Sequence, residues 1–254
     1  MLIFTPLDIP PIPNKQKIID NFVGAEKYVW WKEETLLGNK DFSQQLGDMK
    51  PWNDIAKQKY PELLHWIDTY FPFEYKFYVR LARSTGNVKA HVDGNKTEAP
   101  YKHHMTITQT MLDHQLANEP IGYRFIVTGS RDTLYMCNEY DYNKDLSDQP
   151  KHFCTIPEDT DAFLINNCTQ PHGVDVKPGI DDDRIVGFIL GKVSISAHEK
   201  LIEASTNKYQ DTIDQEKDIK ANRLQQMGIN ILSLIHISEP TRRRGISYAV
   251  FCLK

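Results

Sequence analysis

The chain has 254 residues, with 30 Lys and Arg against 34 Asp and Glu, a formal net charge of −4 and a hydrophobic content of 40%. That length suits one large domain with a substantial core, and a charged fraction of 25% with 11% aromatic residues excludes wholesale disorder. The slight negative charge argues against a nucleic-acid partner, because such binding depends on Lys and Arg at the phosphates.

The sequence shows no sign of membrane or secretory targeting. No apolar run reaches the roughly 18 residues of a membrane span, and the first residues lack the basic flank and long apolar stretch of a secretory signal. The four cysteines (Cys137, Cys154, Cys168 and Cys252) form no C-x-x-C pair, which argues against a disulfide framework or a zinc knuckle. We therefore expect a cytoplasmic protein with no membrane partner.

Residues 1–73 are predicted to form an extended and helical segment that packs on a core. Residues 1–14 contain four prolines, which fix φ and disfavour helix, so this stretch should be extended. Residues 15–36 suit a short helix or a pair of strands. Residues 51–72 carry an apolar stripe interrupted by Pro61, which predicts one or two helices.

Between residues 74 and 196 the pattern changes to short alternating or apolar segments, separated by Gly, Pro, Asn and Asp clusters. Such a series without intervening helices indicates an antiparallel sandwich or barrel. The pattern predicts a mainly β fold with flanking α-helices. The expected strands are 77–82, 88–93, 104–112, 123–129, 132–137, 152–156, 161–166, 173–176 and 184–195.

The last part of the chain divides in two. Residues 197–231 are polar and helical in composition and should pack on the outside of the core. Residues 232–242 (LSLIHISEPTR) and 246–253 (ISYAVFCL) resemble the in-frame translation of a transposase-library sequencing adapter, with room for a sample index between them. We expect 232–254 to be non-native. Without four basic and one acidic side chain of that tail, the net charge changes from −4 to −7.

Histidines carry the strongest chemical signal. His91 and Asp93 share one face of the predicted strand 88–93, because successive side chains of a strand alternate. A second histidine, His172, directly precedes the predicted strand 173–176. Two imidazoles and one carboxylate on one face of an octahedron leave three positions open, which is typical of non-haem Fe(II) oxygenases.

Arg184 follows at the head of the predicted strand 184–195. A guanidinium buried on a barrel strand needs an anionic partner, and its rigid fork suits a carboxylate held by two hydrogen bonds. The neighbouring run Asp181–Asp183 is expected to form a solvated turn. Tyr78 and Arg80, on the strand before the metal strand, are candidates for facing the cavity on its substrate side.

The ordered set H-x-D, H and R resembles the Fe(II)/2-oxoglutarate-dependent dioxygenases. This resemblance implies a double-stranded β-helix (jelly-roll or cupin-like) core with flanking α-helices. Residues 101–112 (YKHHMTITQTML) and the H-G-V after Asn-Asn are similar to the aspartyl/asparaginyl β-hydroxylase-like branch. The aspartate of the metal triad, which members of that branch often lack, is present here as Asp93. The resemblance covers about 75–196.

By this resemblance His91, Asp93 and His172 bind Fe(II), and 2-oxoglutarate chelates the iron while its distal carboxylate pairs with Arg184. His103 or His104 helps to bind that carboxylate; both cannot face the site if both lie in one strand. Dioxygen takes the remaining position, succinate and CO2 are released, and an unactivated C–H of an amino acid, peptide side chain or small metabolite is hydroxylated.

Two other functions fit the same pattern. The first is a cupin-like metalloenzyme that uses the triad without 2-oxoglutarate, which would leave Arg184 facing solvent. The second is a non-enzymatic jelly-roll module, such as a carbohydrate-binding or virion component. That module should have a filled barrel without a polar cavity or a bound metal.

Overall fold

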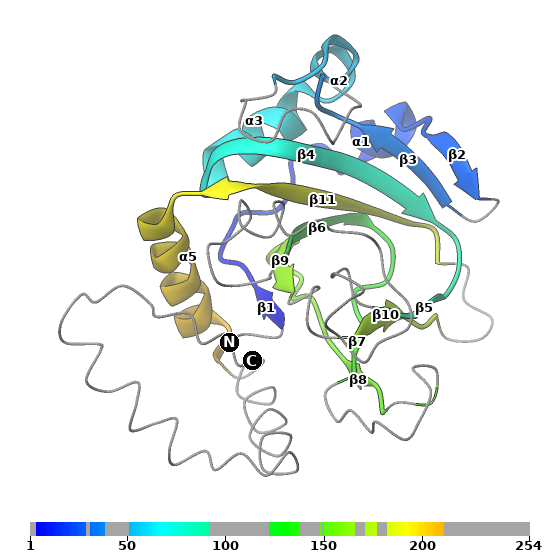
Figure 1. Ribbon diagram of the computed structural model, residues 1–254, viewed down its shortest axis with the longest axis vertical. Helices are drawn as coiled ribbons and strands as arrows, with labels where there is room; N and C mark the ends of the chain where they lie inside the picture. The colour runs from blue at the N-terminus through cyan, green and yellow to red at the C-terminus, as the bar shows by residue number, and fades with distance from the viewer. Residues whose placement is uncertain are drawn as a thin grey trace, which may run out of the picture.

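The protein was analysed as a computed structural model, which describes residues 4–28, 31–38, 51–91, 122–137, 148, 150–165, 171–176 and 182–210 (Figure 1). The predicted strand 104–112, the end of strand 88–93 beyond His91, and the tail 232–254 lie outside these residues. None of the described helices is long and apolar enough to cross a membrane.

Within the described residues, two antiparallel sheets make up most of the fold (Figure 1). The larger sheet has the strand order β1 (Phe4–Pro6), β9 (Ala162–Ile165), β6 (Gly122–Thr128), β11 (Arg184–Val193), β4 (Phe73–Ser84), β3 (Trp31–Thr35) and β2 (Ala25–Tyr28). The smaller sheet has the order β5 (Val88–His91), β10 (His172–Val174), β7 (Leu134–Met136) and β8 (His152–Phe153).

The path of the chain between the sheets identifies the fold. From β4 onward it passes to the smaller sheet in β5, returns in β6, makes β7 and β8 in the smaller sheet, and then alternates through β9, β10 and β11. Eight strands shared in this way by two four-stranded layers form a jelly roll. The predicted double-stranded β-helix core with flanking α-helices is therefore confirmed, and β1, β2 and β3 extend its larger sheet.

The helices lie on the outer face of the larger sheet and at its end. Their bounds are α1 (Lys15–Asn21), α2 (Asp54–Lys59), α3 (Pro61–Tyr70) and α5 (Ile195–Lys208). The stretch 15–36 thus contains both a helix and two strands, and 51–72 contains two helices. The α2 helix is capped by Asn53, whose side chain accepts a 2.7 Å bond from the N–H of Ala56, and Pro61 opens α3 in its first turn.

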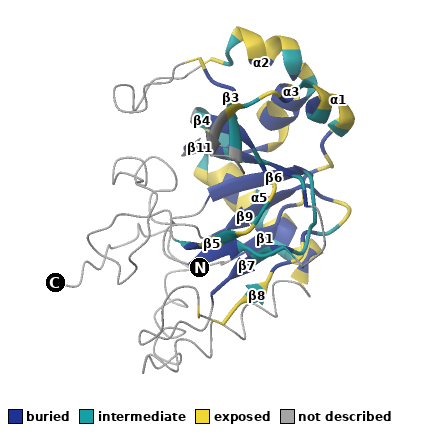
Figure 2. Cartoon of the chain, turned by 90° about the vertical axis from the view of Figure 1, so that its right-hand side faces the viewer, coloured by how far each residue is buried: buried dark blue, intermediate teal, exposed yellow. Residues whose placement is uncertain are grey.

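The main core lies between these helices and the larger sheet. Trp66 of α3 contacts Phe125 of β6 edge to face, with ring centroids 5.5 Å apart, and Phe71 packs against both Trp66 and Tyr123. The buried strands β6 and β9 appear in dark blue in Figure 2. A second, smaller cluster lies between the two sheets and includes Phe4 and Met136. Residues of this second cluster line one side of the cavity described next.

Candidate active site

A cavity of about 260 Å³ lies between the two sheets. The larger sheet contributes side chains from β4, β6, β9 and β11, and the smaller sheet contributes β5, β7 and β10. Aliphatic and aromatic side chains make up about half of the lining residues. The polar lining residues are Glu33, Arg80, Ser84, His91, Arg124, Ser130, Arg131, Thr133, His172 and Arg184.

His91 and His172 meet on the wall of this cavity. They are paired across the neighbouring strands β5 and β10, and their ring centroids lie 4.5 Å apart. The ring Nδ1 of His91 lies 2.8 Å from the carbonyl oxygen of Lys89, so it carries the proton of that hydrogen bond. The basic nitrogen of this tautomer is Nε2, the one that a metal binds.

The third predicted metal ligand, Asp93, lies outside the described residues, as do His103 and His104. Among the residues that are described, no group of three His, Cys, Asp or Glu side chains could hold a metal ion. The structure therefore brings together two of the three predicted ligands, and the rest of the set stays a prediction.

Arg184 is buried in the cavity wall, with 3% of its surface exposed. Its Nη1 donates to Asp182, and its Nη2 donates to Ser84 Oγ at 3.1 Å and to the carbonyl of Gly86. Burial lowers the pKa of the guanidinium, and Asp182 opposes that shift. These three bonds use both Nη atoms and fix the orientation of the guanidinium.

The expectation of a solvated turn at Asp181–Asp183 is wrong for Asp182, which is 2% exposed. Its Oδ2 accepts from Arg184, and its Oδ1 accepts a 2.7 Å bond from the N–H of Ser130. Asp183 forms a partly exposed ion pair with Arg83, and Asp181 lies outside the described residues. The sequence alone does not show that the middle aspartate, Asp182, points to the same inward side of the sheet as Arg184.

Close approach of the backbone at Gly129 helps to place Arg184. Gly129 follows β6 with φ at 110°, and a Cβ there would lie 2.3 Å from Arg184 Cγ. Only glycine adopts this backbone conformation without strain and leaves room for the arginine stem. The end of β6 and the start of β11 can therefore pack closely against each other.

Of the two predicted substrate-side residues, Arg80 lines the cavity and its guanidinium lies over the Tyr78 ring, 5.2 Å from the centroid. Arg80 Nη1 donates to Glu33 Oε1 at 2.5 Å. Sequence reasoning missed Glu33 and also Arg124, which is 4% exposed in the same wall. A signal for Arg124 exists in the sequence, because it is the one charged residue in the apolar strand Gly122–Thr128.

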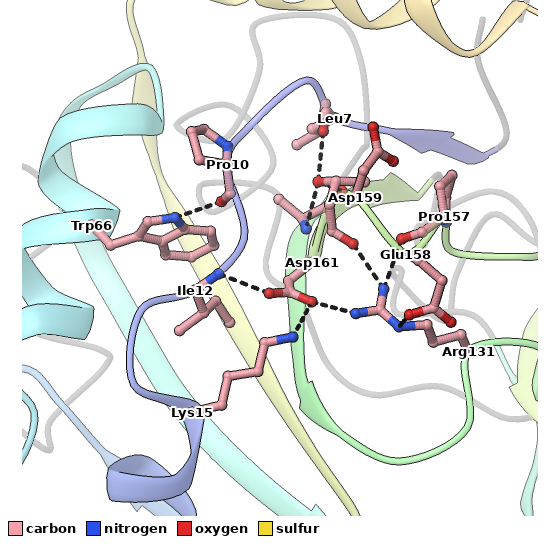
Figure 3. A network of polar contacts seen from close by, with 12 residues as sticks. Leu7, Pro10, Ile12, Lys15, Trp66, Arg131, Pro157, Glu158, Asp159 and Asp161 are labelled. Atoms are coloured by element: carbon pink, nitrogen blue, oxygen red, sulfur yellow. Dashed lines mark hydrogen bonds and ion pairs between the residues drawn. The ribbon is translucent and has the colours of Figure 1, made fainter.

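Arg131 lines the cavity and also belongs to a buried polar network, which is drawn in Figure 3. Asp161 is fully buried and accepts from the N–H of Ile12 at 2.7 Å, from Lys15 Nζ at 2.6 Å and from Arg131 Nη2 at 2.5 Å (Figure 3). Arg131 Nη1 also donates to the carbonyls of Pro157 and Thr160, each at 2.8 Å. This network joins the N-terminal segment to the edge of the cavity.

No protein-family model and no curated protein sequence match the chain. Its fold is similar to solved structures of oxygenases. HygX from Streptomyces hygroscopicus, with nickel and 2-oxoglutarate bound, is 11% identical, with a TM-score of 0.40 over 72% of this chain and 81% of that one. A 2OG-Fe(II) oxygenase family oxidoreductase from Burkholderia pseudomallei is 7% identical, with a TM-score of 0.36 over 70% and 77%.

A prolyl-4-hydroxylase from Pseudomonas putida is also similar, at 10% identity and a TM-score of 0.34 over 76% of this chain and 94% of that one. Likeness at these identities and scores concerns architecture alone.

Proposed function

We propose that this protein is an Fe(II)- and 2-oxoglutarate-dependent oxygenase that hydroxylates an unactivated C–H of an amino acid, a peptide side chain or a small metabolite. One observation carries the proposal. The cross-strand pair His91 and His172 and the buried Arg184 all line one cavity between the sheets of a jelly roll. A pair of imidazoles with a nearby carboxylate-binding cation suits iron and a keto acid together.

The described residues fit a metal of this kind. His91 and His172 would supply two imidazole ligands, and the hydrogen bond from His91 to Lys89 orients the first of them. Asp93 would complete the facial set, as expected two residues along the same strand. Two histidines and one carboxylate leave positions for a co-substrate and dioxygen, whereas structural zinc sites are closed.

The co-substrate would lie between the histidines and Arg184. The distal carboxylate of 2-oxoglutarate would pair with Arg184, with help from His103 or His104. Because Asp182, Ser84 and Gly86 already hold the guanidinium, little side-chain entropy is lost when the carboxylate binds. Tyr78 and Arg80 belong to the substrate side in this arrangement.

Bound iron and 2-oxoglutarate would supply the oxidising power that dioxygen needs to hydroxylate a C–H bond, with succinate and CO2 as co-products. The chain's own part is to position and to exclude water. Val88, Ile126 and Val186 are among the aliphatic side chains that close the cavity around the polar groups. Where these side chains exclude water, each charge acts more strongly than it would in water.

Both alternative functions lose support in this geometry. A cupin-like enzyme without 2-oxoglutarate was expected to leave Arg184 in solvent, but Arg184 is buried in the cavity wall. A non-enzymatic jelly-roll module was expected to have a filled barrel. The barrel instead encloses a cavity with several charged side chains.

Succinate release by the purified full chain tests the proposal. We expect Fe(II)- and 2-oxoglutarate-dependent succinate formation. It should fall at least about 100-fold in His172→Ala, because one metal ligand is lost. His65→Ala is the matched control, since His65 is exposed on α3 and should leave turnover unchanged. Equal turnover in wild type and His172→Ala, or no turnover in any condition, would count against the proposal.

A further inference from the structure

The strand that carries His91 is irregular at a decisive place. From Val88 to His91, β5 has one residue more than the part of β10 that pairs with it, His172–Val174. The two inner residues, Lys89 and Ala90, therefore lie opposite a single residue of β10, which is the arrangement of a β-bulge. We refer to Lys89 and Ala90 as the β5 bulge.

The β5 bulge decides which way His91 faces. Successive side chains of a regular strand alternate between its two faces, so residues three positions apart lie on opposite faces. Val88 and His91 are three positions apart, yet both line the cavity. The extra residue of the bulge shifts the alternation by one position. It thereby brings the imidazole of His91 to the cavity side, where its ring centroid lies 4.5 Å from that of His172.

The bulge also supplies the hydrogen-bond acceptor of His91. The carbonyl of Lys89 accepts from Nδ1 of His91 at 2.8 Å, which leaves Nε2 as the nitrogen that can bind a metal. A bulge interrupts the ladder of hydrogen bonds between two strands, so a carbonyl within it can turn to a side chain. The direction and the tautomer of His91 thus both depend on the backbone of the β5 bulge.

Tyr135 contacts this bulge from the other side of the smaller sheet. It lies on β7 opposite Gly173 and therefore on the face away from His172 (Figure 1). Its hydroxyl reaches across β10 and donates to the carbonyl of Val88 at 3.4 Å. Burial raises the pKa of this hydroxyl, and a hydrogen bond with the backbone of Ala90 opposes the rise. One hydroxyl thus joins β7 to the backbone of β5 at the bulge.

Gly173 makes this crossing possible. A Cβ on Gly173 would lie 2.4 Å from the hydroxyl oxygen of Tyr135 and 2.5 Å from the carbonyl oxygen of Val88. A glycine within a strand often marks such a close approach. The ring of Tyr135 is also held in place by Phe153, with ring centroids 6.0 Å apart, and by Lys151 Nζ, 4.8 Å from the ring centroid. With 3% of its surface exposed, Tyr135 is fixed over the glycine.

We propose that Tyr135 is a positioning residue for the metal site, because its hydroxyl holds the β5 bulge in the shape that directs His91 into the cavity. This inference rests on the proposed function, since it takes His91 and His172 for metal ligands. Tyr135 is not among the described residues that line the cavity, so it acts through the backbone of β5 rather than by contact with a ligand.

Nitrogen-15 NMR of the histidine rings in the metal-free full chain tests this role, with His91→Gln to assign the signals of His91. Where the imidazole is neutral, the wild type should show mainly the tautomer protonated at Nδ1. Tyr135→Phe removes only the hydroxyl and should give a mixture of both neutral tautomers, because the Lys89 carbonyl is no longer held. An unchanged tautomer in folded Tyr135→Phe overturns the proposal.

Tyr60→Phe is the matched control. Tyr60 lies between α2 and α3, and its hydroxyl also donates to a backbone carbonyl, that of Asn21, at 3.2 Å. Its removal deletes the same atom from the same kind of hydrogen bond away from the cavity, so the tautomer of His91 should not change. An equal change in Tyr60→Phe and Tyr135→Phe would mean a general loss of stability and would also overturn the proposal.

Titration with Co(II), followed by visible absorption, measures the consequence at the metal site. Tyr135→Phe should bind Co(II) about ten-fold more weakly than the wild type and with an altered ligand-field spectrum. Tyr60→Phe should match the wild type. Gly173→Ala should weaken Co(II) binding at least as much, because its Cβ displaces the Tyr135 hydroxyl. Thermal unfolding verifies that each variant is folded, and Tyr135→Phe alone decides if Gly173→Ala is not.

The two measurements separate this role from the proposed function. If the tautomer of His91 changes in Tyr135→Phe but the wild type binds no Co(II), Tyr135 still positions His91 and the oxygenase proposal fails. If the wild type and Tyr135→Phe bind Co(II) equally and with the same spectrum, the metal site stands and the positioning role of Tyr135 fails.

Discussion

The two faces of the larger sheet differ in chemistry, although they belong to the same strands. Along β4, β6 and β11 the outward residues are apolar and pack beneath the helices: Val79, Leu81, Tyr123, Phe125, Val127, Ile185 and Ile189. The inward residues alternate with them and include charged groups that line the cavity: Arg80, Ala82, Ser84, Arg124, Ile126, Arg184, Val186 and Phe188.

This division teaches how the fold accommodates buried charge. The outward face supplies hydrophobic stabilisation, which is non-directional and scales with the area removed from water. The inward face bears guanidiniums, which need fixed partners such as Asp182 and Glu33. Substitutions on the outward face should therefore change stability through lost packing, and those of charged residues on the inward face should change stability where they break an ion pair.

The largest effect is expected on the outward face. Phe125→Ala removes a fully buried ring that contacts Trp66, so it should lower the free energy of unfolding by about 3–5 kcal/mol. Urea unfolding followed by tryptophan fluorescence measures this. Phe153→Ala is the control, because Phe153 is 45% exposed, and it should cost less than about 1 kcal/mol. Equal costs would remove the distinction between core and surface.

The second-largest effect is expected for the buried ion pair between Asp182 and Arg184 on the inward face. Asp182→Asn leaves the buried Arg184 without its carboxylate and should cost about 3 kcal/mol of unfolding free energy. Asp183→Asn, the same change one residue along, breaks only the partly exposed pair with Arg83 and should cost at most about 1 kcal/mol. Chemical denaturation compares the two variants. A larger loss in Asp183→Asn would contradict the burial argument.

A smaller loss is expected where a side chain is added to the outward face. The Cβ of Gly187→Ala would lie 1.9 Å from Phe125 Cζ, so the ring must shift, at a cost of about 1–3 kcal/mol. Gly86→Ala meets no atom within 4 Å and should be neutral or slightly stabilising. Melting temperatures of the two alanine variants test this difference. A lower melting temperature for Gly86→Ala would refute it.

The smallest effect concerns the pH dependence of Asp183. A hydrogen bond from Arg83 holds the pKa of Asp183 below its ordinary value. Because the folded-state pKa is lowered, this pair stabilises the protein above the unfolded pKa, and the contribution is lost as the pH falls through the folded pKa. Arg83→Gln should move the pKa of Asp183 up, toward its ordinary value. Carboxyl NMR titration measures this, and an unchanged pKa would contradict it.

Much of this organisation could be predicted from the sequence. Period-2 alternation and turn residues indicated an antiparallel sandwich or barrel, since one face of each strand has to be apolar, and the family resemblance narrowed this to the jelly roll. His91 and His172 were identified from residue type and order alone, and they are cross-strand neighbours. Arg184 was expected to be buried, and it is.

The partners of these residues could not be predicted. Asp161 accepts hydrogen bonds from Ile12 and Lys15, which lie about 150 positions earlier in the chain. No local sequence pattern predicts such a contact. Asp182 was expected to be solvated like its neighbours. Its burial could not be predicted, because it depends on which way the preceding loop turns. Glu33 reaches the cavity from β3, a strand added outside the eight-stranded core. Long-range tertiary contacts decided each of these cases.

The place of β11 has a consequence for the assembly of the protein. It is the last strand of the core in sequence, yet it lies in the middle of the larger sheet, between β4 and β6 (Figure 1). A nascent chain that has not yet reached residue 184 leaves β4 and β6 with open edges, which are prone to pair with other chains. Addition of β11 closes both edges in one event and brings Arg184 and Phe188 into the barrel. Placement of β11 therefore completes both the larger sheet and one wall of the cavity.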